Sequence, residues 1–403
     1  MTKSAFLAGD LNQLLPDMPL DCQKHLFSLE ENVHYLNCSY MGPLLKTVEA
    51  AGVEGVLQKR NPFRIPPGGF FSGAAELKPL FAQLVGGAAD RVAIIPSVAY
   101  GMGIVARNLK GKPGGQIVTV HEDFPSNVYP WQRVAQEKDL AIRVVTPPDT
   151  LRQRGQQWNE KILDALTPDT VMVAVPHVHW ADGTRFDLET IGNRAKEVGA
   201  LLVVDGTQSV GALPIDVQRF RIDALVCGGY KWLMGPYSLG VAYLSDSFDD
   251  GIPLEESWMN RRGSDDFQRL VAYEPQYRPG AARYDVGEHS NFILLPMLTA
   301  ALRQILAWEP AQIQAYCRRL TAPLVAYLGA HGYWTEDPAW RGEHLLGVRL
   351  PAGLDMATLQ ERLAARRVLV SVRGDSIRVS PHLYNEPHDV AALLEVLASV
   401  KEK

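Results

Sequence analysis

The 403-residue sequence lacks the marks of a membrane protein or a secreted one. Its apolar runs all fall short of the roughly 18 to 20 residues that span a bilayer. The N-terminal stretch MTKSAFLAGDLNQLLPDMPLD has no sustained apolar core of the kind that a signal peptide needs. These absences predict a cytoplasmic protein with no membrane partner.

Cysteine and clustered positive charge are also scarce. Four cysteines lie far apart, at Cys22, Cys38, Cys227 and Cys317. Because no C-x-x-C pair occurs, they predict neither a structural zinc site nor a disulfide framework, and they fit a reducing compartment. The formal net charge is −5 and no Lys/Arg-rich tract is present, so the sequence predicts no nucleic-acid partner.

Short β-rich runs alternate with amphipathic helical patterns through most of the sequence. We expect seven strands, at Val92–Ile95, Gln116–Val120, Ile142–Val145, Val171–Val175, Leu201–Val204, Ala224–Cys227 and Val241–Leu244. Helices are expected between them, including Ser97–Leu109, Asn127–Lys138 and Asp187–Val198. Apolar strands separated by helices of this length are typical of βαβ units and of a sheet buried on both faces. The fold class expected is therefore α/β with a mostly parallel seven-stranded sheet.

The pattern changes after about residue 250. A polar stretch leads into a long predicted helix over 291–308, after which strand and helix signals alternate. This order is typical of a smaller α+β domain. We assign residues 30–285 to the large domain, and residues 1–29 and 286–403 to a small domain that completes the substrate site. The proline- and glycine-rich segment 60–73 predicts an irregular loop.

Two ionisable residues follow predicted strands and should meet at one edge of the sheet. Asp205 ends the run Leu201–Val204, and Lys231 follows Ala224–Cys227 after two glycines and a tyrosine. Functional residues of open α/β sheets gather at the carboxyl ends of strands. A lysine and an acid at this edge suit pyridoxal 5′-phosphate (PLP). This cofactor forms an aldimine with a lysine and needs an acid beside its pyridine nitrogen.

Other residues at the same edge fit the rest of this cofactor. The helix that starts near Ser97 offers the backbone N–H groups of Ser97, Val98 and Ala99 to a phosphate. Phe124, which follows Gln116–Val120, supplies a flat side chain to cover the ring. Each residue alone is an ordinary cap, surface or core residue, so the prediction depends on their occurring together.

The segment LLVVDGTQSVGALPIDVQRFRIDALVCGGYKWLMGPYSLGVAYLS contains D-x-x-Q, a short link, and a strand ending in lysine followed by G-P-x-x-x-G. It resembles the signature of the class V aminotransferase family, the cysteine desulfurase-like enzymes of PLP fold type I. It is also similar to kynureninase and to isopenicillin N epimerase-like members. The resemblance runs from Tyr35–Pro43 to Ile377–Val390 and covers most of the chain. It implies a PLP-dependent transferase fold of type I.

For the cofactor, the resemblance implies that Lys231 forms the aldimine and moves the proton, and that Asp205 pairs with the pyridine nitrogen. Trp180 stands where desulfurases place an asparagine near the ring oxygen O3′, so Gln208 is the implied O3′ donor. Trp180 is then either a wall of the cofactor pocket or a core residue. The remaining implied contacts are Phe124 on the ring face, and Tyr230, Ser97 and Val98 at the phosphate.

For the substrate, the resemblance implies that Arg378, in IRVSPHLYN, pairs bidentately with the α-carboxylate. Asn37, in YLNCSYMGP, is implied as a second substrate contact. Glu288 and His289 fall where a partner subunit reaches the cofactor phosphate in similar enzymes. That position implies a homodimer with its active site near the subunit interface.

The chain departs from the desulfurase pattern in a way that bears on activity. Desulfurases carry a catalytic cysteine on a loop shortly before the substrate arginine, and here that region reads VLVSVRGDSIRVS. A non-catalytic binding protein of this fold would be expected to lose Lys231 or Asp205, and both are present. The sequence therefore predicts a PLP enzyme that acts on a small-molecule amino acid without forming a persulfide. We expect an aminotransferase, with β-elimination or C–S lyase activity as the alternative and epimerisation third.

Two other kinds of site, a dinucleotide site and a metal site, are each suggested by a short motif. GMGIVA, Gly101–Ala106, matches the G-x-G-x-x-A of dinucleotide-binding proteins, but that motif requires its first glycine directly after the strand, and PSVAY intervenes here. His177 and His179 are two residues apart and would share a strand face, with Asp182 nearby. The sequence, however, indicates no further metal ligand and no residues that would hydrogen-bond to these histidines from outside the site. We therefore predict no dinucleotide and no metal.

Overall fold

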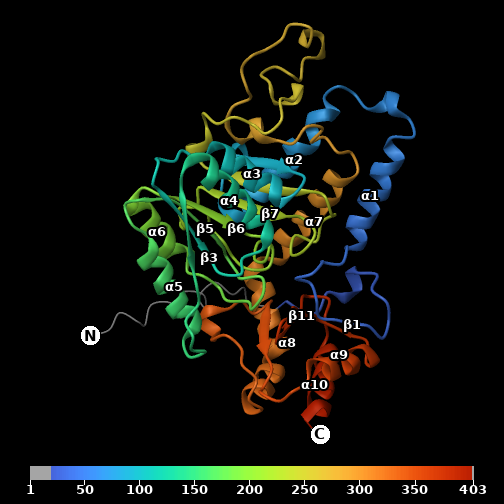
Figure 1. Cartoon of the computed structure of the whole chain (residues 1–403). Helices are drawn as coiled ribbons and strands as arrows, with labels where there is room; N and C mark the ends of the chain where they lie inside the picture. Colours follow the sequence, from blue (N-terminus) through green and yellow to red (C-terminus); the bar gives the residue numbers. More distant parts are fainter. Residues whose placement is uncertain (1–19, 402–403) are drawn as a thin grey trace.

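The computed structural model describes residues 20–401, and a seven-stranded sheet with helices on both faces forms its centre (Figure 1). The strands are β2 (Val92–Ile95), β3 (Gln116–Val120), β4 (Ala141–Val145), β5 (Thr170–Pro176), β6 (Leu201–Asp205), β7 (Ala224–Gly228) and β8 (Gly240–Leu244). Their order is β2-β8-β7-β6-β5-β3-β4. Strand β8 is antiparallel to both neighbours and the other pairs are parallel, which confirms the predicted sheet.

Alternate residues of the central strands enter two separate apolar cores. In β7, Leu225 and Cys227 belong to one core, and Ala224 and Val226 belong to the other. Successive side chains of a strand point to opposite faces, so a sheet covered on both faces reads as a continuous apolar run. Strand β4 is the exception, since it is an edge strand whose Val144 is half exposed.

Four helices between the strands cover the two faces: α3 (Val98–Asn108), α4 (Tyr129–Lys138), α5 (Arg154–Ala165) and α6 (Leu188–Val198). The predicted limits of α6 are confirmed by its ends. The Asp187 carboxylate accepts from the backbone N–H groups of Glu189 and Thr190, and Gly199 closes the helix at a φ of 76°. The predicted helix over Ser97–Leu109 is likewise confirmed, and it contains both glycines of GMGIVA.

The prediction that residues 60–73 form an irregular loop is wrong in its last part. Helix α2 (Gly69–Val85) begins inside that segment, with Gly68 as its N-cap and two prolines before it. Phe70 packs edge-on against Phe292 with ring centroids 5.4 Å apart, so burial of this aromatic side chain outweighs the local glycine content. Helix α1 (Lys46–Gln58) was also missed; a side chain at its Gly55 would meet the Phe292 carbonyl oxygen at 2.4 Å.

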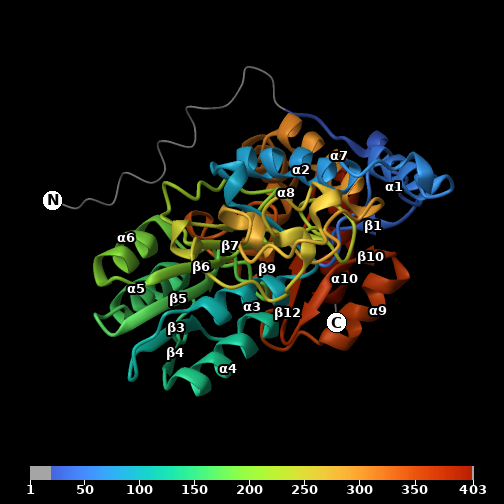
Figure 2. The same cartoon turned by 90° about the horizontal axis from the view of Figure 1, so that it is seen from above.

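The C-terminal part consists of helices around a small sheet. Its helices are α7 (Leu294–Trp308), α8 (Pro310–Ala330), α9 (Met356–Ala365) and α10 (Pro387–Lys401). Strands β11 (Ser371–Arg373), β12 (Ser376–Val379) and β9 (Leu346–Arg349) form an antiparallel sheet in that order. Strands β1 (His34–Tyr35) and β10 (Val368–Leu369) form a short parallel pair, which lies near α9 and α10 in Figure 2.

The N-terminal segment returns to this C-terminal sheet. The backbone N–H of Cys38 donates to the Ser380 carbonyl at 3.0 Å, and that of Ser380 donates to the Leu36 carbonyl at 2.8 Å. The first 19 residues of the predicted small-domain segment 1–29 lie outside the described residues. The two-domain division stays a prediction. Within residues 20–401, no helix has both the length and the apolar character that crossing a bilayer requires.

Candidate active site

Lys231 lies three residues beyond β7, in a loop held by backbone contacts. Gly229 donates to the Leu239 carbonyl at 2.9 Å, and Gly42 donates to the Tyr230 carbonyl at 2.9 Å. A side chain at Gly42 would meet the Lys231 carbonyl oxygen at 2.2 Å, so only glycine allows this approach. The lysine is 9% exposed, and its Nζ lies 5.7 Å from the ring centroid of Phe124 and 5.5 Å from that of Tyr230.

The amine of Lys231 sits in an environment that disfavours its charge. Burial lowers the pKa of Lys231 to about 8; Asp205 opposes this shift, and the positive charges of Arg378 and Arg373 add to it. A larger fraction of this amine is therefore neutral at physiological pH than of an ordinary lysine, whose pKa is about 10.4. The neutral form is the nucleophile.

Asp205 is the last residue of β6 and is held by two donors. Its Oδ1 accepts from the backbone N–H of Thr207 at 2.8 Å, and its Oδ2 accepts from Nδ2 of Asn127 at 2.7 Å. The residue is 9% exposed. The carboxylate is thus fixed in orientation, with lone pairs left on both oxygens.

Asn127 links Asp205 to a second buried carboxylate, that of Asp123. Asn127 and Asp123 were not predicted as site residues from the sequence. Nδ2 of Asn127 also lies 3.3 Å from Oδ1 of Asp123, and the Asn127 Oδ1 has no partner. Burial raises the pKa of Asp123 to about 7, and the charge of Asp205 acts in the same direction. The only local signal was their place in HEDFPSN after β3.

Gln208 is buried and its amide is largely occupied. Nε2 donates to the Ser39 carbonyl at 3.1 Å, and Oε1 accepts from the indole N–H of Trp232 at 3.0 Å. An amide nitrogen carries two protons, so one N–H of Gln208 is left for another acceptor.

Phe124 and Trp180 form an aromatic pair beside the lysine. Their rings meet edge to face with centroids 5.6 Å apart, and the Trp180 indole N–H donates to the Glu122 carbonyl at 2.7 Å. Phe124 is 39% exposed and Trp180 is half-buried. Trp180 therefore stands beside Phe124 at the site rather than deep in the core.

Arg378 brings a buried positive charge to the same place. It is 1% exposed, its Nη1 donates to the Trp180 carbonyl, and its Nη2 lies 3.4 Å from Oγ of Ser371. Oγ of Ser371 in turn donates to Oδ1 of Asn37 at 2.7 Å, so Asn37 and Arg378 belong to one hydrogen-bonded chain. Burial and the nearby charge of Arg373 lower the pKa of Arg378 to about 9.

The predicted phosphate contacts lie further along the same edge. Strand β2 is parallel in direction to β7 but is separated from it by β8, about 10 Å away at the usual strand spacing. Ser97 is the N-cap of α3, its Oγ accepts from the backbone N–H of Tyr100, and Ser97 is exposed while Val98 is half-buried. The rings of Tyr230 and Tyr237 pack at a tilt of 60° with centroids 4.6 Å apart.

The two residues implied at a subunit interface, Glu288 and His289, differ in solvent exposure. Glu288 is exposed and has a φ of 58°, whereas His289 is 2% exposed and packs against the ring of Phe71. Burial lowers the pKa of His289. Of these two residues, Glu288 is therefore the one that a second chain could contact in this structure.

The residues considered for a metal engage in other contacts. Nε2 of His179 lies 3.1 Å from the His121 carbonyl and Nδ1 lies 3.1 Å from Asp182, while Asp182 also pairs with Arg154 at 2.8 Å. Both ring nitrogens of His179 face acceptors, and Asp182 raises its pKa against the opposing effect of burial. His177 packs against Phe220 instead. Within residues 20–401, no group of three or more His, Cys, Asp or Glu residues is placed to hold a metal.

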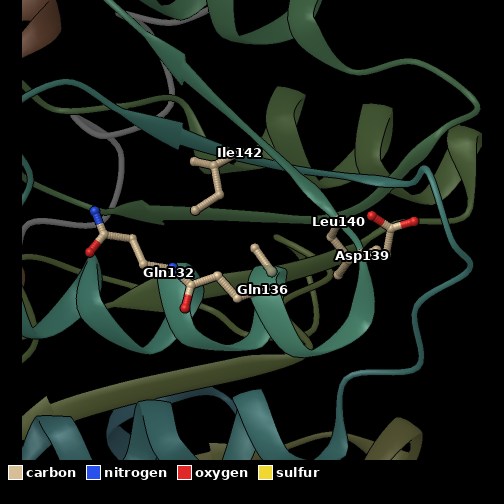
Figure 3. A pocket seen from close by; sticks show the side chains of 6 residues that line it. Gln132, Gln136, Asp139, Leu140 and Ile142 are labelled. Atoms are coloured by element: carbon tan, nitrogen blue, oxygen red, sulfur yellow. The ribbon is translucent and has the colours of Figure 1, made fainter.

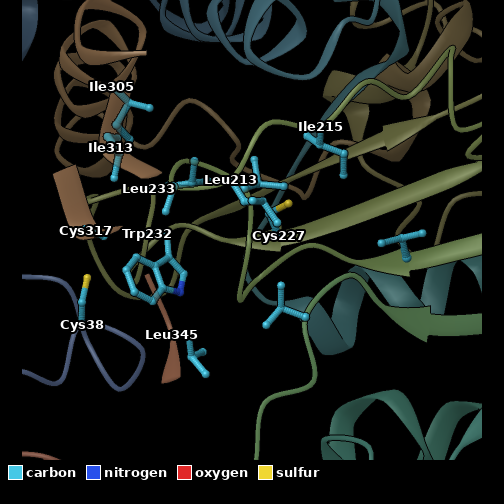
Figure 4. Close-up of a cluster of buried hydrophobic side chains, with 14 of the residues drawn as sticks. Cys38, Leu213, Ile215, Cys227, Trp232, Leu233, Ile305, Ile313, Cys317 and Leu345 are labelled. Atoms are coloured by element: carbon cyan, nitrogen blue, oxygen red, sulfur yellow. The ribbon is translucent and has the colours of Figure 1, made fainter. Parts of the chain in front are cut away.

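Three of the four cysteines are buried, and one of them, Cys38, interacts electrostatically with the Lys231 amine. Cys38, Cys227 and Cys317 are buried among the apolar side chains around Trp232 in Figure 4. Burial raises the pKa of all three thiols. Cys22 is half-buried.

An open depression of about 570 Å³ between α4 and β4 is unrelated to these residues (Figure 3). Its lining consists of Gln132, Ala135, Gln136, Asp139, Leu140 and Ile142. It offers no cation and no nucleophile, and Lys231 and Asp205 are not part of it. We place the candidate active site at Lys231, on chemical grounds.

The sequence model of the family described as "Aminotransferase class-V" matches residues 70–393. "Uncharacterized aminotransferase YcbU" of Bacillus subtilis is 28% identical over 79% of this chain and 81% of that protein. "Isopenicillin N epimerase" of Streptomyces clavuligerus is 26% identical over 78% and 81%. "Probable cysteine desulfurase" of Pyrococcus abyssi is 33% identical over 43% of each chain. This last likeness gives no support to the prediction that the chain forms no persulfide.

Among solved structures, that of a C-DES mutant with glycine covalently linked to the PLP cofactor superposes with a TM-score of 0.81. The match covers 96% of this chain and 100% of that chain at 22% identity. A likeness at this identity concerns the fold. It confirms the predicted fold class over almost the whole chain.

Proposed function

Because the chain belongs to the class V aminotransferase family and is therefore an enzyme that uses PLP, we propose that it transfers the amino group of an α-amino acid. PLP, when bound, would supply an electrophilic carbon for the substrate amine and an electron sink for the substrate Cα. The observation that carries the proposal is the buried Lys231 amine, which interacts with the charges of Asp205 and of the buried Arg378.

The side chains around Lys231 fit this cofactor. The amine has a pKa lowered to about 8, which suits covalent attachment. Asp205, oriented by Thr207 and Asn127, is proposed to keep the ring nitrogen protonated. Gln208 retains one N–H for the ring oxygen, and Phe124 is proposed to cover the ring.

The phosphate is proposed to bind the N-terminus of α3, where Ser97 and Val98 lead the helix, together with Tyr230. The first N–H groups of a helix have no partner within it and favour an anion. Trp180 is proposed as the pocket wall beside Phe124. Asn37 is proposed to contact the substrate through the chain that links it to Arg378.

In this proposal Lys231 removes the Cα proton and delivers it to the cofactor side, so a single base is enough. Epimerisation needs a second acid–base group on the opposite face, and the proposed cover on that face, Phe124 beside Trp180, does not titrate near neutral pH. The burial of three of the four thiols supports a reaction without a persulfide.

The experiment mixes the enzyme with a panel of amino acids and follows the bound cofactor. Accumulation of pyridoxamine phosphate with formation of a keto acid supports transamination. Pyruvate and ammonia without that accumulation would identify a β-lyase, and loss of optical rotation alone would identify an epimerase. Cyanide-releasable sulfur on the protein would identify a persulfide and overturn that part of the proposal.

We expect Arg378→Gln to lower kcat/KM for amino acids about 10²- to 10³-fold, mainly through KM, because a buried guanidinium binds a carboxylate strongly. Steady-state kinetics measure this. Thermal unfolding shows whether the variant remains folded. A KM within a factor of two of the wild-type value would place α-carboxylate binding at another residue.

We expect uptake of PLP by the cofactor-free protein to accelerate about tenfold per pH unit up to pH 8 and to level off above it. Only the neutral amine reacts, and the lowered pKa of about 8 makes Lys231 neutral at a lower pH than an ordinary lysine. Stopped-flow absorbance measures this rate. A rate that keeps rising to pH 10 would contradict the lowered pKa.

We further propose a homodimeric, cytoplasmic enzyme whose exposed Glu288 lies at the subunit interface. The cysteines of residues 20–401 form no disulfide, which supports a reducing compartment. Sedimentation velocity tests the dimer.

A further inference from the structure

A second arginine, Arg373, stands beside Arg378 at the candidate active site, and sequence reasoning missed it. Ser371 of β11 is paired with Arg378 of β12, and Arg373 is paired with Ser376 across the same hairpin. Residues two apart on a strand share a face, so Arg373 and Arg378 are diagonal neighbours on one face of the hairpin.

Both arginines contact Trp180. Arg378 donates to its carbonyl oxygen, and the Cζ atom of Arg373 lies 5.2 Å from the centre of its ring. Trp180 in turn meets Phe124, the ring next to the Lys231 amine. The two guanidinium groups therefore border the side of the site where a substrate attached near Lys231 would extend.

Neither arginine has a carboxylate partner within residues 20–401. Nη1 of Arg373 donates to the Val372 carbonyl at 2.7 Å, and Nε of Arg373 and of Arg378 are both buried without a hydrogen bond. The acid next in sequence, Asp375, instead accepts from Oγ of Ser376 at 3.0 Å. By contrast, the buried Arg154 lies within ion-pair distance of both Asp182 and Glu336.

Two adjacent guanidinium groups without a counter-charge repel each other and the Lys231 ammonium. This repulsion contributes to the lowered pKa values of Arg378 and Lys231. The α-carboxylate of a substrate neutralises one of the two positive charges. The other stays unbalanced unless the substrate carries a second anion.

We propose that Arg373 binds a carboxylate at the end of the substrate side chain, so that the enzyme acts on acidic α-amino acids. This inference rests on the proposed function, since it assumes that the α-amino group reacts near Lys231 and that Arg378 holds the α-carboxylate. It assigns Arg373 as the residue that selects the substrate side chain.

The experiment compares acids with their amides on the complete enzyme, using L-aspartate against L-asparagine and L-glutamate against L-glutamine. We expect at least one acid to exceed its amide about 10- to 100-fold in kcat/KM. Arg373→Gln should remove this preference by lowering kcat/KM for the acid about 10- to 100-fold more than for its amide, whereas Arg373→Lys should keep part of the preference.

Arg349→Gln is the matched control, because Arg349 also stacks on a tryptophan, Trp334 at 5.3 Å, and also has a buried Nε without a partner. It lies on the neighbouring strand β9, and its loss should leave substrate preference unchanged. A binding measurement gives a second readout. Calorimetry should show glutarate or succinate binding more tightly than butyrate to the wild type and to Arg349→Gln, but not to Arg373→Gln.

Equal turnover of acids and amides by the wild type would overturn the inference. So would an equal loss for all substrates in Arg373→Gln, because that result marks a residue that only supports Trp180. If no amino acid changes the bound cofactor, the proposed function itself fails. Turnover of L-alanine without any preference for acids would overturn only the inference about Arg373.

Discussion

Lys231→Ala is expected to lower kcat by at least about 10³-fold and to abolish the visible absorbance of covalently held cofactor. The variant lacks both the amine that holds PLP and the base that moves the Cα proton. In the wild type this amine is buried beside Phe124 and Tyr230 with a pKa lowered to about 8, and no second lysine contacts those rings in the described part of the chain.

Two measurements and a control test this expectation. Borohydride reduction of the wild type followed by peptide mass spectrometry should find the cofactor mass on Lys231. Lys196→Ala, which removes an exposed lysine of α6, should leave kcat and absorbance unchanged. Turnover by Lys231→Ala within tenfold of the wild-type value, or cofactor mass on another lysine, would be incompatible with the assigned role.

Asp205→Asn is expected to lower kcat about 10²- to 10³-fold while the cofactor stays attached to Lys231. An amide cannot hold a proton on the ring nitrogen as a carboxylate does, so electron withdrawal from Cα weakens. The substitution preserves the shape of the side chain, but its amide has a single acceptor oxygen, so it can accept from Thr207 or from Asn127 and not from both. Because the shape is kept, the substitution separates the charge of Asp205 from its packing.

Asp223→Asn provides the comparison. Asp223 immediately precedes β7, at the opposite end of the strand from Lys231, and its Oδ2 accepts from the backbone N–H of Leu202 at 2.9 Å. This variant should change kcat less than twofold even if it lowers Tm. A kcat for Asp205→Asn close to that of Asp223→Asn would show that the charge of Asp205 has no role in catalysis.

Strand positions were predictable from the sequence because burial on both faces leaves a continuous apolar run. Val92–Ile95 and Gln116–Val120 were predicted with their observed limits. Helices α1 and α2 were missed: α1 carries Gly52 and Gly55 in its interior, and α2 starts within a proline- and glycine-rich stretch and has Pro79 inside it. Their contacts with α7, such as the close approach of Gly52 in α1 to Met297, form only in the folded chain.

At the candidate active site, Asp123 and Asn127 were likewise not predictable from the local sequence. Nothing local distinguishes them from other polar residues after β3. The contact between Asn127 and Asp205 joins residues 78 positions apart, and it exists because parallel strands bring their carboxyl ends to one edge. The pKa of Asp123, raised to about 7, is likewise a consequence of burial and of a neighbour that is distant in sequence.

The sequence by itself determined the sheet and the pair of Asp205 and Lys231, because both lie at the carboxyl ends of neighbouring apolar strands and strand direction then places them together. Only the tertiary structure decided what surrounds that pair. Arg378 meets Trp180 across 198 positions, and Arg373 joins them through the pairing of β11 with β12. Side chains brought together over such separations depend on packing of the whole chain, and no local pattern records which charges will be left without a partner.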